Sequence, residues 1–157
     1  MKQIQTGEGA FIHLWSSQDA LVIKCLSETL TTQLNLSACC THIKGHGGLK
    51  ETVVAIQQQL SGFRFVLKTD VKDFYVSIDQ MMLLEQLANQ LDDRVLLNYL
   101  WQIIHRTVKV GGNFWDVNQG ISIGCSLSPL FGALCLKALD DAMGNTVGIT
   151  CAIWTTS

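Results

Sequence analysis

Proline and charged residues are scarce in this sequence. Its 157 residues include a single proline, and only 15% of them are charged while 48% are hydrophobic. Disordered chains show the opposite balance, because high charge and low hydrophobicity leave too little apolar surface to bury. We therefore expect one globular domain over residues 1–157, or a piece of a larger one.

Long apolar runs are also missing. None approaches the roughly 18 residues that a membrane-spanning helix needs, and the polar residues 1–9 lack the apolar core of a signal peptide. We expect no membrane association and a cytoplasmic location. The six cysteines are then expected to be reduced thiols rather than a disulfide framework.

The apolar spacing that is present predicts an α+β fold. Apolar residues three and four apart indicate helices, and strict alternation indicates strands. We expect helices over residues 20–30, 49–60, 81–91 and 130–139, a further helix capped by Asp92-Asp93, strands over 63–70 and 147–154, and a hairpin over 107–117 that turns at Gly111-Gly112. Asp140-Asp141 is expected to end the last helix.

A glycine-rich segment around residues 39–50 allows two interpretations. It holds four zinc-ligand types close together, namely Cys39, Cys40, His42 and His46. A structural zinc site usually draws its ligands from two separated stretches, and there is no second cluster. Alternatively, the glycines together with Lys44, His46 and Lys50 present backbone N–H groups and positive charge to a phosphate.

The segment from Phe63 to Asp79 places a carboxylate where a predicted strand ends. Asp70 follows the alternating residues and precedes Phe74-Tyr75. A carboxylate at such a boundary is well held and still reachable, which suits a metal ligand. The alternative is that Asp70 and Asp73 only begin the next helix as N-caps, a role for which aspartate is preferred. We assign Asp73 and Asp79 to caps and local structure.

A glycine-containing loop precedes the last helix. It runs from Gly120 through Gly124 to Leu127, and Ser128-Pro129 then gives a strong helix start.

The order of these motifs resembles the reverse transcriptases of bacterial group II introns and retrons. Residues 19–30 followed by residues 42–48 resemble the fingers segments of that family. Residues 70–79 resemble its first catalytic motif, and residues 120–139 the loop and helix that contact template and incoming nucleotide. The resemblance implies helical fingers over residues 1–60 and a partial palm over residues 61–157. The palm would carry a small antiparallel sheet built from the 63–70 strand, the 107–117 hairpin and the 147–154 strand.

The resemblance also implies a chemistry. The activity would be RNA-directed DNA polymerisation, extending a DNA primer with dNTPs on an RNA template by a two-metal mechanism with Mg²⁺ or Mn²⁺. By resemblance, Asp70 is the catalytic metal ligand, the carbonyl of Val71 assists one metal, Tyr75 and Gly124 contact the nucleotide, and Lys44, His46, Lys50 and Gly120 contact nucleic acid.

The chain departs from the family in ways that bear on activity. Gln18 and Ala20 stand where the family has arginines, and Ser122-Ile123 replaces a Pro-Gln pair. The aromatic-x-Asp-Asp motif is missing, since the residues after Trp154 supply no carboxylate. We therefore expect a chain that is truncated before this motif and is inactive, or nearly so.

Two alternatives from other functional classes remain at this point. One is a non-catalytic RNA-binding module that uses Lys44, Lys50 and Arg64. The formal net charge of −2 speaks against it, because nucleic-acid binders usually carry a basic excess. The other is a small zinc-binding interaction domain centred on Cys39 to His46.

Overall fold

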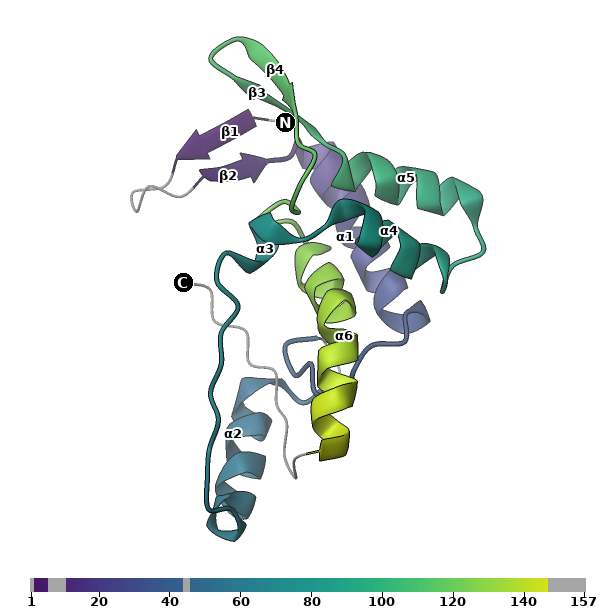
Figure 1. Ribbon diagram of the computed structural model, residues 1–157. Coiled ribbons are helices and arrows are strands. Elements are labelled where there is room, and N and C mark those ends of the chain that lie inside the picture. The colour runs from purple at the N-terminus through teal and green to yellow at the C-terminus, as the bar shows by residue number, and fades with distance from the viewer. Residues whose placement is uncertain (1, 6–10, 44–45, 147–157) are drawn as a thin grey trace.

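The fold consists of helices packed around α6 (Ser128–Thr146) and a small four-stranded sheet. The computed structural model describes residues 2–5, 11–43 and 46–146, and Figure 1 shows their arrangement. The helices are α1 (Ser17–Gln33), α2 (Gly48–Gln59), a 3-10 turn η1 (Leu60–Gly62), α3 (Phe74–Ser77), α4 (Gln80–Ala88), α5 (Arg94–Ile104) and α6 (Ser128–Thr146); the strands are β1 (Lys2–Gln5), β2 (Phe11–Leu14), β3 (Thr107–Val110) and β4 (Asn113–Asp116). The predicted α+β class is confirmed. Within these ranges, no helix is both long and apolar enough to cross a bilayer.

The sheet contains four strands in the order β2-β1-β3-β4. Two antiparallel pairs, β1 with β2 and β3 with β4, meet through a parallel contact at Lys2 and Lys109. The predicted hairpin is confirmed: Gly111 and Gly112 form its turn with φ of 56° and 91°, values that glycine adopts without strain. The sheet is therefore mixed rather than purely antiparallel.

The predicted strand over residues 63–70 is wrong. These residues form no strand, and every residue from 61 to 73 is exposed. Alternation indicates strand geometry, but a strand also needs a neighbour that pairs with its backbone, and no described strand lies beside this segment. The predicted strand over 147–154 falls outside the described residues.

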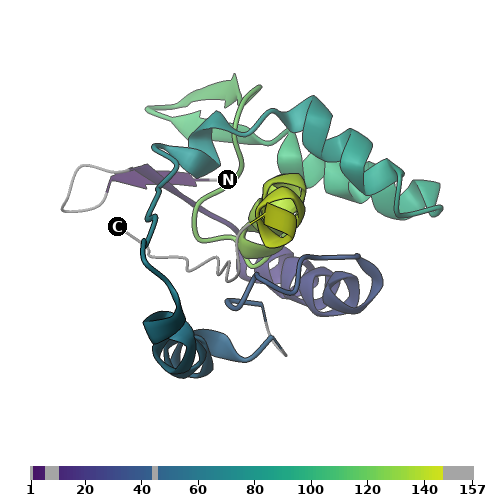
Figure 2. The ribbon, with the colours of Figure 1, turned by 60° about the horizontal axis from the view of Figure 1, so that its bottom comes forward.

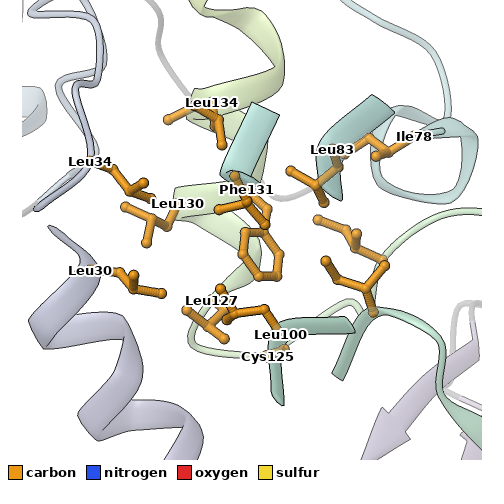
Figure 3. Packing of buried hydrophobic residues seen from close by; sticks show 14 of the residues in the cluster. Leu30, Leu34, Ile78, Leu83, Leu100, Cys125, Leu127, Leu130, Phe131 and Leu134 are labelled. Carbon is orange, nitrogen blue, oxygen red and sulfur yellow. The ribbon is translucent and has the colours of Figure 1, made fainter. Parts of the chain in front are cut away.

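The core is centred on α6. Figure 3 shows the Phe131 ring among leucines contributed by α1, α4 and α5. The largest fully buried side chains are Leu30, Cys40, Leu83, Leu87, Leu100, Ile104, Leu127, Leu130 and Phe131. The predicted helix after Ser128-Pro129 is thus confirmed, and its N-terminal half contributes Leu130, Phe131, Ala133 and Leu134 to the core.

Aspartates begin two of the helices as predicted. Asp79 Oδ1 accepts backbone N–H bonds from Met81 at 2.8 Å and Met82 at 3.0 Å, and Asp93 caps α5 in the same way. Asp73 occupies the corresponding position before α3, but its side chain makes no cap hydrogen bond and its φ is +53°. Its contribution to α3 is therefore its backbone conformation.

Asp140 does not end α6, contrary to the prediction. The helix continues to Thr146, and Asp140 is buried within it. The Cys40 Sγ donates a hydrogen bond of 3.3 Å to Asp140 Oδ2. Burial, together with this carboxylate, raises the pKa of the Cys40 thiol to about 12. The contact connects the loop after α1 to α6, which is why this aspartate is found facing inward.

Candidate functional site

The loop before α6 is hydrogen-bonded to the segment that follows Asp70. The Gly120 N–H donates to the Ile78 carbonyl and the Ile121 N–H donates to the Tyr75 carbonyl, both at 2.8 Å. Figure 1 shows this loop passing beside α3 on its way to α6. Two motifs that are far apart in the sequence therefore meet in one place.

Gly120 is required at this contact. Its φ is +72°, and a Cβ added there would lie 2.6 Å from the Val76 carbonyl oxygen and 2.8 Å from that of Tyr75. These are backbone atoms, which cannot move aside as the end of a flexible side chain can. Gly120 is also buried. The structure thus gives a different reason for this glycine than room for nucleic acid: it lets the loop pack on α3.

Two buried polar side chains hold the carbonyl of Gly120. Gln80 Nε2 donates to it at 2.8 Å and to the Val117 carbonyl at 3.0 Å. Arg106 Nη1 donates to the Gly120 carbonyl at 3.1 Å, and desolvation lowers the pKa of this guanidinium to about 10. The sequence places Gln80 three residues after Ser77, as in a capping box, but the N-cap of α4 is Asp79. Arg106 stands between His105 and Thr107, so no apolar flank signals its burial.

The remainder of the loop is tied to α1 and its N-terminal flank. Ser27 Oγ donates to the Ser126 carbonyl at 2.8 Å, and Trp15 Nε1 donates to Ser122 Oγ at 3.3 Å. Ser122, one of the departures from the family pattern, is buried and takes part in this internal network. Gly124 differs, because it is exposed, has φ of +79° and has open space where a Cβ would be.

Asp70 and Val71 lie in the exposed segment before α3. The carboxylate is accessible, as a metal ligand should be. However, the described residues contain no group of three or more His, Cys, Asp or Glu side chains that could hold a metal ion. A pair of Mg²⁺ ions needs several carboxylate oxygens in addition to water and phosphate. The donors present around Asp70 therefore do not fit a two-metal centre.

The same finding argues against a zinc site at Cys39, Cys40, His42 and His46. All four candidate side chains lie in the described part of the chain, yet they form no such group. Cys40 turns to Asp140, and His42 Nε2 lies 3.2 Å from the Pro129 carbonyl oxygen. Burial lowers the pKa of His42. These residues pack the loop against α6.

Tyr75 lies between the exposed segment and the core. It is half-buried and packs against the core cluster, with its ring centroid 5.6 Å from that of Phe74. Burial raises the pKa of the Tyr75 hydroxyl to about 12, so this hydroxyl is neutral at physiological pH. Phe74 packs against the same cluster, as a core residue would.

The predicted phosphate contacts lie at a different end of the molecule. Lys44 is outside the described residues, His46 is half-buried, and Lys50 is exposed in the first turn of α2. An open depression of about 630 Å³ at this helix start is lined by Thr41, His42, Ile43, Gly47, Gly48, Leu49 and Glu51. Figures 1 and 2 both show α2 separated from α3 by the extended segment.

A carboxylate occupies the start of α2. Glu51 Oε2 lies 3.0 Å from the position that a Cβ on Gly47 would take. Negative charge near a helix N-terminus is favourable because it faces the positive end of the helix dipole. Glu51 thus places negative charge where a phosphate would have to bind, which disfavours an anion site at this depression.

No family model matches this chain, and no curated protein is significantly similar to it.

We expect Gly120→Ala to be much more destabilising than Gly124→Ala. Both glycines have positive φ, which costs an alanine about 1 kcal/mol, but only the Gly120 substitution also drives a Cβ into backbone atoms. The expected loss is about 3 kcal/mol for Gly120→Ala and about 1 kcal/mol for Gly124→Ala, measured by urea unfolding. Equal losses would show that the loop is not packed on α3 in this way.

Removal of the buried amide should also weaken the loop. Gln80→Ala deprives the Val117 carbonyl of the donor seen here and leaves the Gly120 carbonyl with Arg106. Leaving buried acceptors unsatisfied costs about 1–3 kcal/mol. The matched control is Gln102→Ala, an exposed glutamine in α5, for which unfolding should change by less than about 0.5 kcal/mol. A Gln80 variant as stable as this control would refute the role.

Proposed function

We propose that this chain is the template- and nucleotide-contacting portion of an RNA-directed DNA polymerase of the reverse transcriptase type. The contact between Gly120-Ile121 and the Tyr75–Ile78 segment supports this proposal. The resemblance assigns these two segments to a single site, and residues that act on the same nucleotide must lie together. A chance similarity of motifs would not require the two segments to be in hydrogen-bond contact.

Accessibility of the key positions also supports the proposal. Asp70 and Gly124 are exposed, so a nucleotide could reach both the carboxylate and the glycine backbone. Arg64, Lys68 and Lys72 are exposed along the segment that leads to α3. Positive charge there suits a phosphate backbone.

The metal chemistry of the family is not complete in these residues. Around Asp70 the described residues offer no further carboxylates arranged for metal binding, and residues 147–157 contain no aspartate or glutamate. Asp70 would hold Mg²⁺, or Mn²⁺, only together with ligands from elsewhere. We therefore propose that this polypeptide by itself binds template and primer without extending the primer.

Primer extension tests the proposed inactivity. On poly(rA)/oligo(dT) with dTTP and either Mg²⁺ or Mn²⁺, the chain should extend the primer no more than its Asp70→Ala variant does. Asp92→Ala, another exposed aspartate, serves as the matched control. Extension that Asp70→Ala abolishes and Asp92→Ala spares would show a complete active centre and contradict the inactivity.

Salt-dependent binding tests the nucleic-acid contacts. We expect the chain to bind an RNA–DNA template–primer, measured by fluorescence anisotropy, with an affinity that falls as salt rises. Each lysine–phosphate contact adds about 0.9 to the slope of log affinity against log salt, so substituting the exposed Lys72 in Lys72→Gln should reduce the slope by about that amount. Lys24→Gln removes a lysine already paired with Glu28 and should leave the slope nearly unchanged. Absence of binding at low salt would contradict the proposed function.

A further inference from the structure

The segment from Phe63 to Val71 exposes an unusual amount of apolar surface. Phe65 is 88% exposed, Leu67 78% and Val66 76%. Figures 1 and 2 show the segment as a long, stretched trace that joins the lower end of α2 to α3 along one side of the molecule. Contiguous exposed apolar residues of this kind mark an interaction site or an aggregation site.

The backbone of this segment also lacks hydrogen-bond partners among the described residues. In the described part of the chain, no backbone hydrogen bond involves residues 64–72. Phe63 adopts extended dihedrals with φ of −116° and ψ of 141°. An extended, apolar stretch with free N–H and C=O groups is a template for adding a β-strand.

We propose that a second copy of this chain pairs with the 63–71 segment. The two segments would run antiparallel around a two-fold axis at Leu67, forming a symmetric dimer. Such an interface is self-complementary, because the same patch is used by both copies.

The alternation of side chains fits this arrangement. With Leu67 opposite itself, Phe63 lies opposite Val71 and Phe65 lies opposite Thr69 of the second copy. Side chains two residues apart share a face of a strand, so all of these lie on one face. The dimer then buries a continuous apolar face that each copy alone exposes.

Charge selects the register. In this pairing, Arg64 lies opposite Asp70 of the second copy, and the symmetry produces this pair twice. Moving the axis to Val66 would put Arg64 opposite Lys68, and moving it to Lys68 would put that lysine opposite itself. Directly opposed charges stabilise a strand pair when opposite in sign and destabilise it when alike.

Other registers lose the match in different ways. A shift of the pairing by a single residue would place charged side chains of one copy on the apolar face of the other. Moving the axis to Thr69 pairs Lys68 with Asp70 but leaves Phe63 and Phe65 without extended partners. The axis at Leu67 is thus the register that pairs the whole segment and opposes unlike charges.

Charge reversal of the full chain tests the register. Sedimentation equilibrium should show a dimer whose dissociation constant rises about tenfold or more in Arg64→Asp and in Asp70→Arg, because each creates two like-charge pairs. The double variant restores the pairs in reverse and should recover dimerisation. Arg94→Asp, an exposed arginine at the start of α5, is the control. Single and double variants that all behave like the control would overturn the proposal.

Site-directed cross-linking tests the axis. Under mild oxidation, Leu67→Cys should form a covalent dimer readily, because directly opposite Cβ atoms lie about 5 Å apart. In Thr69→Cys the two thiols would be about 13 Å apart along the strands and should not cross-link. Since the chain has six native cysteines, both are compared with the unsubstituted protein.

Two outcomes would refute the dimer. A monomer at all concentrations, with residues 63–71 protected from hydrogen exchange, would mean that another part of the same chain covers the segment. Equal cross-linking of the two cysteine variants would likewise overturn the proposal. The test does not involve nucleic acid, so its result is independent of the proposed polymerase function.

Discussion

The close contact between Gly120 and the backbone of Tyr75 and Val76 is the constraint on which the rest of this site depends. It joins the loop before α6 to the turn that follows Asp70, and it leaves no room for a side chain. Gln80 and Arg106 donate to the same carbonyl from buried positions. Because an unsatisfied buried polar group costs about 1–3 kcal/mol, these bonds also fix the loop in one conformation.

The contact matters for function because it positions the Gly124 loop near α3 but, within the described residues, brings no second carboxylate to Asp70. It places Gly124, exposed and with open space at its Cα, in the loop that is docked behind Tyr75. It does not place a second carboxylate near Asp70, since the described residues contain no metal-binding group. Under the proposed function, this arrangement would position a nucleotide and a template without performing the transfer by itself.

In contrast to this packed contact, the 63–71 segment is exposed and unpaired in the described part of the chain. Its side chains alternate as in a strand, yet no described strand pairs with it. In the proposed dimer, Asp70 forms an ion pair with Arg64 of the second copy, whereas in the monomer it is accessible to a metal or a nucleotide. Dimerisation and ligand binding at Asp70 would then compete for one carboxylate.

Local chemistry determined much of this protein. Caps at Asp79 and Asp93, the Gly111-Gly112 turn and the start at Ser128-Pro129 could be predicted because each acts on its own neighbours in the chain. The tertiary structure decided which groups are buried together. Asp140 was predicted to end α6, but it is buried within the helix and accepts a hydrogen bond from Cys40. Gln80 fits a capping box with Ser77 in the sequence, yet its amide donates to three backbone carbonyls. Residues 63–70 have strand alternation but no described strand beside them. A helix cap or turn is completed within a few residues, whereas burial and strand pairing depend on partners that the local sequence does not name.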